Sequence, residues 1–123
     1  MAIMAISVTP IGTGSTSVGG FVADALRVIE GSGLRYELNA MHTVVEGDLA
    51  ALMALVPEIH AALFAKGARR LSTVIKVDDR RDAPSTIDAK VRSVRAQMQQ
   101  PSARPTARRP ATRARAPRRR VSR

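Results

Sequence analysis

The stretch LRYELNAMHTVVEG, residues 34–47, contains two short segments typical of β-strands. In residues 34–41 apolar and polar side chains alternate, and this period of two predicts a strand. Residues 42–47 predict a second strand, and the two segments are close enough to form a hairpin. An antiparallel pair in the middle of the chain is therefore the starting point for the fold.

Upstream of this hairpin, the sequence predicts a strand followed by a helix. Residues 3–11 alternate with period two until Pro10, which cannot donate to a sheet ladder and ends the strand. Apolar residues then recur at helical spacing from Val18 to Ile29, and the GSG segment at 31–33 stops the helix.

Downstream of the hairpin, the sequence predicts a second long helix and then a fourth strand. Asp48 is expected to cap a helix that ends at Gly67, and residues 69–77 predict a fourth strand. Pro57 lies inside this helix, but the apolar period continues past it, so we expect one kinked helix rather than two. A shorter third helix is expected over residues 85–98, with Ser85 as its cap.

The order β-α-β-β-α-β predicts a ferredoxin-like α+β fold, with a four-stranded antiparallel sheet and two helices on one face. The opposite face would be bare and partly apolar, which favours either self-association or a ligand. The side chains expected on it are Ile3, Ala5, Ser7, Asn39, Met41, Val74 and Lys76.

Charge divides the chain into a domain, residues 1–100, and a tail, residues 101–123. The net charge of +10 belongs almost entirely to the tail, which holds nine arginines, four prolines and no acidic residue. With one large aliphatic residue, Val121, the tail cannot bury enough apolar surface to offset its ordering entropy, so we expect it to be disordered.

The glycine-rich segment PIGTGSTSVGG, residues 10–20, has two interpretations. It lacks the lysine of a phosphate-binding P-loop, and Ser17 stands where a dinucleotide-binding pattern needs glycine. Gly12 and Gly14 can form a tight turn, with a hydroxyl among residues 15–17 capping the following helix. Alternatively, the amides and hydroxyls form part of a polar pocket wall.

Three motifs together resemble the small thiamine-binding protein family: PIGTGSTS at 10–17, YELNAM.T..EG at 36–47 and KVDDR at 76–80. The resemblance covers roughly residues 3–95. It implies a ferredoxin-like fold, a homotetramer built as a dimer of dimers through the sheets, and binding of thiamine or its hydroxymethylpyrimidine part without catalysis. The sequence departs from the family pattern at His42, where a small residue such as glycine is usual, at Pro57 and in the arginine tail.

Thiamine is expected as a bound ligand rather than a cofactor, and its chemistry suggests roles for residues in these motifs. Asn39 offers a donor and an acceptor to the aminopyrimidine, and Glu46 could accept from its amine. Asp78 or Asp79 could offset the thiazolium charge. The expected ligand-binding residues are Thr13, Ser17, Tyr36, Asn39, Met41, Thr43, Glu46 and Asp78.

Alternative roles for these residues remain open. Tyr36 could point to the helices, Glu46 could pair with a nearby arginine, and Asp78 to Arg81 could form a solvated loop with mutual ion pairs.

No other class of function is as well supported by the sequence. We expect no enzyme, because the chain has no cysteine, only two histidines and no metal-ligand spacing among its carboxylates. Nucleic-acid binding is the alternative: residues 101–123 could contact nucleic acid without sequence preference, or could have no function. The N-terminus lacks a secretory signal pattern and no apolar run could span a membrane, so we expect a cytoplasmic protein.

Overall fold

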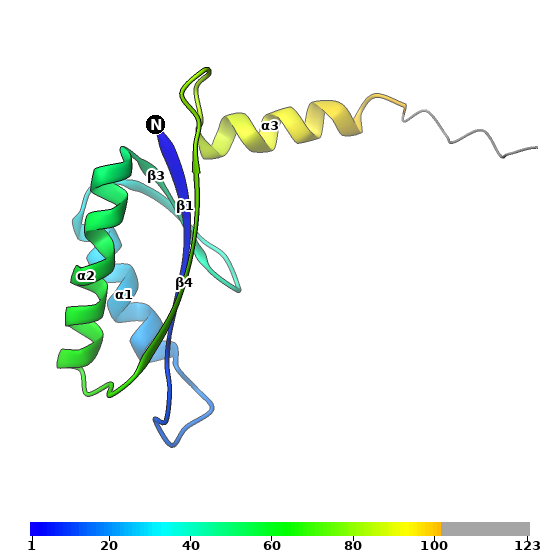
Figure 1. Cartoon of the computed structure of the whole chain (residues 1–123). Coiled ribbons are helices and arrows are strands. Elements are labelled where there is room, and N and C mark those ends of the chain that lie inside the picture. Colours follow the sequence, from blue (N-terminus) through cyan, green and yellow to red (C-terminus); the bar gives the residue numbers. More distant parts are fainter. Residues whose placement is uncertain (102–123) are drawn as a thin grey trace, which may run out of the picture.

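Seven elements make up the part of the chain that the structure, a computed structural model, describes, residues 1–101. In chain order they are β1 (Ala2–Pro10), α1 (Gly19–Gly31), β2 (Arg35–Leu38), β3 (Thr43–Gly47), α2 (Leu49–Ala65), β4 (Leu71–Asp79) and α3 (Ile87–Met98). The strands form one antiparallel sheet in the order β2-β3-β1-β4, and α1 and α2 lie on the same side of it (Figure 1). The predicted ferredoxin-like fold is confirmed. The predicted tail and its nucleic-acid contacts lie, apart from Pro101, outside the described residues.

The core lies between the sheet and the two long helices. Every second residue of β1 faces these helices, and Ala2, Met4 and Ile6 are buried there. The helices complete the core with residues at helical spacing: Ile29 of α1 and Leu52, Leu55, Ile59 and Leu63 of α2. The apolar period of α2 continues across Pro57, and the prediction of a single helix is confirmed.

The predicted hairpin is present, but its first strand is shorter than expected. The last paired residues are Leu38 and Thr43, and the Asn39 N–H donates to the His42 carbonyl at 2.9 Å. This bond closes a turn over residues 39–42 and ends the ladder. The placement of Asn39 and Met41 on the bare face of the sheet was wrong, because both lie in this turn.

The two glycines before α1 support a tight turn, as predicted. Gly12 and Gly14 have φ angles of 77° and 75°, a region that other residues rarely adopt. The expectation that a hydroxyl of residues 15–17 caps α1 was wrong, because α1 begins only after Val18 and has no side-chain cap. Instead, the Ser15 Oγ accepts from the Ser17 N–H at 3.1 Å, so this hydroxyl stabilises the turn itself.

The cap of α3 also differs from the prediction by one residue. The Thr86 hydroxyl accepts from the Ala89 N–H at 3.1 Å, which satisfies one free amide of the first turn. The Ser85 hydroxyl is buried and has no hydrogen-bond partner within the described part of the chain. Asp48 does occupy the position before α2, but its side chain makes no cap hydrogen bond.

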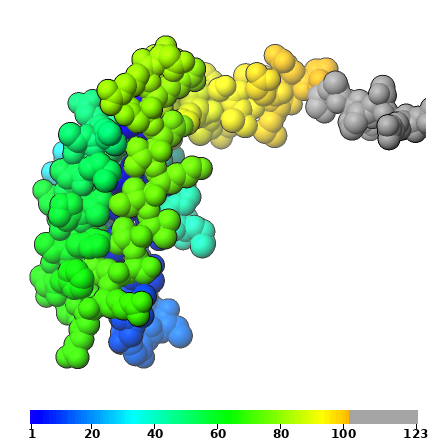
Figure 2. Space-filling model, viewed as in Figure 1, coloured from blue at the N-terminus to red at the C-terminus, as the bar shows by residue number. Residues whose placement is uncertain are grey.

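Within residues 1–101, the face of the sheet opposite α1 and α2 is covered only at one end. Ala5, Ser7, Val74 and Lys76 lie on this open face, where Val74 is 66% exposed. At the end nearest the N-terminus, the first turn of α3 covers it, and Ile87 is buried. The rest of α3 leads away from the domain (Figures 1 and 2) and exposes Val91, Val94 and Met98.

We predict that Thr86→Ala lowers the free energy of unfolding by about 1 kcal/mol, because it removes the cap of α3. Urea denaturation followed by circular dichroism measures the change.

Ser85→Ala is the matched control. Its hydroxyl has no partner to lose, so the substitution should leave the unfolding free energy unchanged or slightly higher. A larger loss from Ser85→Ala than from Thr86→Ala would contradict the assignment of the cap.

Candidate functional site

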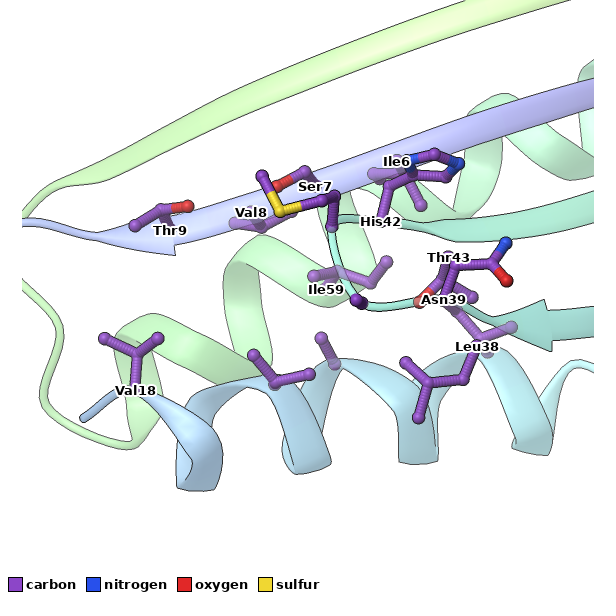
Figure 3. A pocket seen from close by; sticks show the side chains of 15 residues that line it. Ile6, Ser7, Val8, Thr9, Val18, Leu38, Asn39, His42, Thr43 and Ile59 are labelled. Atoms are coloured by element: carbon purple, nitrogen blue, oxygen red, sulfur yellow. The ribbon is translucent and has the colours of Figure 1, made fainter.

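A cavity of about 250 Å³ lies between β1, α1 and the turn that joins β2 to β3 (Figure 3). This is close to the lower end of the ~300–1,000 Å³ range typical of small-molecule pockets. Its apolar lining comes from both helices and β1: Ile6, Val8, Val18, Val22, Ala25, Ile29 and Ile59, with Leu38, Ala40 and Met41 from the β2–β3 region. Its polar lining is Ser7, Thr9, Asn39, His42 and Thr43.

The cavity exists because β1 continues beyond the end of β3. β3 begins at Thr43, opposite Ile6, whereas β1 runs on to Pro10 with β4 as its partner. From residue 7 to residue 9, therefore, no described strand pairs with the β3 side of β1. Alternate backbone N–H and C=O groups on a strand edge are hydrogen-bonding groups that need partners. Figure 3 shows Ser7, Val8 and Thr9 along this edge, with Val18, the residue before α1, across from them.

The turn over residues 39–42 forms the wall beside this free strand edge. Its closing bond uses the backbone of Asn39 and His42, and no side-chain hydrogen bond of Asn39 is found among the described residues. The amide of Asn39 therefore remains available as both donor and acceptor. Thr43, the first residue of β3, is buried with 7% of its surface exposed, whereas Met41 is 82% exposed.

The cavity is nearly uncharged. None of its lining residues is Asp, Glu, Lys or Arg, and His42 is the one ionisable side chain among them. No group of three or more His, Asp or Glu side chains in residues 1–101 is arranged to hold a metal ion. The cavity thus offers hydroxyl, amide and imidazole groups above an apolar floor.

Of the predicted site residues, the structure brings Asn39, Met41 and Thr43 together in this cavity. Tyr36 packs against the core on the helix side of the sheet. Thr13 and Ser17 belong to the exposed turn before α1 and do not line the cavity, although Val18, the next residue along the chain, does.

Glu46 and Asp78 lie away from the cavity, toward the other end of the sheet. Both pair in register with Ile3, which is three residues from Ile6 and so about 10 Å from it along β1. The Glu46 carboxylate accepts from the Ile87 N–H at 2.7 Å, and Asp78 forms an ion pair with Lys90. These two carboxylates therefore anchor the first turn of α3.

Arg35 completes this anchor on β2. Its guanidinium donates to Asp88 at 2.9 Å and to Glu46 at 3.4 Å, and the hydrogen bond with Asp88 raises the pKa of Arg35 above its usual value. The interpretation of Glu46 as the partner of a nearby arginine is confirmed.

The loop after β4 is a set of exposed ion pairs. Asp79 accepts from Arg81 at 2.9 Å, and Asp82 accepts from Arg80 at 2.7 Å. These hydrogen bonds lower the pKa of each carboxyl from its usual value. The prediction that residues 78–81 form a solvated loop with mutual ion pairs is confirmed only for Asp79 with Arg81. Asp78 and Asp79 lie in β4, and Asp78 pairs with Lys90 of α3.

Sequence reasoning did not assign Thr9, Ser7 or His42 to the ligand site. Ser7 was expected on the bare face, where the structure does place it, but not in a cavity, and His42 stood out only as a departure from the family pattern. Their position in the cavity depends on how far β1 runs past β3, which is a property of strand register and has no sequence motif.

Comparison with known proteins identifies the family. A family model described as thiamine-binding protein matches residues 4–95. The UPF0045 protein YqgV of Bacillus subtilis is 41% identical over 103 residues, which is 80% of this chain and 99% of YqgV. A UPF0045 protein of Mycobacterium tuberculosis is 44% identical over 93 residues, covering 75% of this chain and 89% of the relative.

Solved structures agree with this relationship. A protein of Methanocaldococcus jannaschii superposes with a TM-score of 0.71 at 31% identity, covering 76% of this chain and 94% of that one. A Thermotoga maritima protein proposed to act in thiamine biosynthesis or salvage gives 0.65 at 25% identity, covering 76% and 97%. The resemblance found in the three motifs is confirmed, and the chain belongs to the thiamine-binding protein family.

Proposed function

We propose that the protein binds thiamine, or its hydroxymethylpyrimidine part, in the cavity beside β1 and catalyses no reaction on it. The observation that carries this proposal is the free edge of β1 facing Asn39 and Thr43 across a small apolar floor. An aminopyrimidine is flat and carries donors and acceptors along its rim. It needs the combination of backbone edge, amide and hydroxyl that this cavity offers.

The apolar and polar parts of the cavity suit different parts of such a ligand. Ile6, Ile29 and Ile59 supply an aliphatic floor for the face of the ring. Asn39 presents its amide at the rim, and Met41 adds a polarizable side chain that is exposed in the absence of a partner.

A binding role rather than a catalytic one is supported by the side chains of the cavity. A nucleophilic Ser or Thr needs a base within hydrogen-bond reach. No hydrogen bond joins His42 to Ser7, Thr9 or Thr43 in the described part of the chain. The remaining histidine, His60, contacts Thr73 of β4 at 2.6 Å and does not line the cavity.

Self-association is the second part of the proposal: a homotetramer assembled as a dimer of dimers through the sheets. The open face carries exposed Val74, and α3 exposes Val91 and Val94 on the same side of the sheet. Exposed apolar side chains on the open face and on the projecting part of α3 favour burial against another surface.

We predict that Asn39→Ala weakens thiamine binding about tenfold or more without unfolding the protein, because it removes an amide with two hydrogen-bonding roles. Isothermal calorimetry gives the affinity, and circular dichroism checks the fold.

Asp78→Asn is the matched control at the other end of the sheet. It removes a charge that was expected to face the thiazolium but that pairs with Lys90, and it should leave thiamine affinity unchanged. Loss of binding in Asp78→Asn together with full binding in Asn39→Ala would move the site to the α3 end of the sheet.

We further predict that light scattering of the full chain gives the mass of a tetramer, and that Val74→Glu shifts it to smaller species. A carboxylate at an exposed apolar position would have to be desolvated in a sheet-to-sheet contact. Leu49→Glu, on an exposed position of α2 away from the open face, should leave the tetramer intact. A monomeric wild-type chain would refute the assembly.

A further inference from the structure

His42 is an exposed lining residue of the cavity, and no other residue of the lining has an ionisable side chain. The residues that α1 and α2 contribute are apolar, and those from β1 are apolar or hydroxyl-bearing. The imidazole is therefore the one group of the lining that can carry a net charge.

The charged residues of the adjacent strands are also few. Glu37 of β2 pairs in register with Val44, and it already forms an ion pair with Arg35 at 3.2 Å. Lys76 of β4 pairs in register with Ala5, which in turn pairs with Val44. Arg35 also pairs with Glu46 and Asp88, so it offsets the charge of Glu37 only in part. Glu37 and Lys76 are the charged strand residues nearest in register to His42, and neither lines the cavity.

A cavity of this kind distinguishes ligands by charge. Thiamine carries a permanently cationic thiazolium, whereas the pyrimidine alcohol that forms its other half is neutral near neutral pH. Two like charges within one small cavity repel each other, and no lining carboxylate offsets them. Histidine is the side chain whose charge commonly changes between about pH 5 and pH 8.

We propose that His42 determines the charge selectivity of the cavity: in its protonated form it disfavours cationic thiamine, while the neutral aminopyrimidine alcohol still binds. This inference rests on the proposed function. It differs from that function because it concerns which of two related ligands is preferred, and the residue that sets the preference.

The test compares the two ligands on the full-length protein by calorimetry, at about pH 8 and about pH 6. Thiamine affinity should fall about fivefold or more over this interval relative to the affinity for the pyrimidine alcohol. The cationic thiazolium makes the attached aminopyrimidine less basic than the free alcohol, so each ligand is titrated separately and its affinity is corrected for its own protonated fraction before the ratio is taken.

Two variants assign the effect to one residue. In His42→Gln the ratio of the two affinities should no longer depend on pH. In His60→Gln, which removes the histidine that contacts Thr73 outside the cavity, the dependence should persist. If the ratio of the two affinities still depends on pH in His42→Gln, the proposal is overturned.

The wild-type measurement alone separates this inference from the proposed function. If both ligands bind and the ratio of their affinities is the same at both pH values, the role of His42 is wrong and the binding function stands. If neither ligand binds at either pH, the proposed function fails and the inference fails with it.

Discussion

Among the residues that the structure describes, β1 has two strand partners along its first half and one along its second half. From Ala2 to Ile6 it is hydrogen-bonded to β3 and β4, and this double pairing holds the centre of the sheet against both helices. Beyond Ile6 only β4 continues. The unpaired edge that results has backbone groups that must be satisfied by water, a ligand or another chain, and the cavity is built around it.

The charged residues of the domain are segregated from this cavity. The acid–base pairs made by Arg35, Glu46, Asp78 and Lys90 gather at the α3 end of the sheet. The loop after β4 holds its own pairs, Arg80 with Asp82 and Arg81 with Asp79. The carboxylates of the motifs therefore form ion pairs outside the cavity, and the polar lining of the cavity contains no carboxylate.

Much of the fold could be predicted because its signals are local. Alternation in residues 3–11 and helical spacing in α2 depend on which residues are buried, and burial determined both elements. The N-cap of α3 was harder to predict, because Ser85 and Thr86 are adjacent and both residue types are good N-caps. The site was predicted only in part. Asn39, Met41 and Thr43 adjoin in sequence and in space, whereas the position of Glu46 and Asp78 depends on register and on where α3 docks.

α3 is attached to the sheet through its first turn, and the rest of the helix projects from the domain. Its first turn is joined to the sheet by Asp88 with Arg35, by Lys90 with Asp78, and by the amide of Ile87 with Glu46. From residue 91 onward every residue of the helix is exposed. Ion pairs at a surface weaken as dissolved salt screens them, whereas this screening does not weaken the packing of the buried, uncharged Ile87. The orientation of α3 relative to the sheet therefore depends on ion pairs that high salt weakens. The packing of Ile87 keeps the first turn attached to the sheet at any salt concentration.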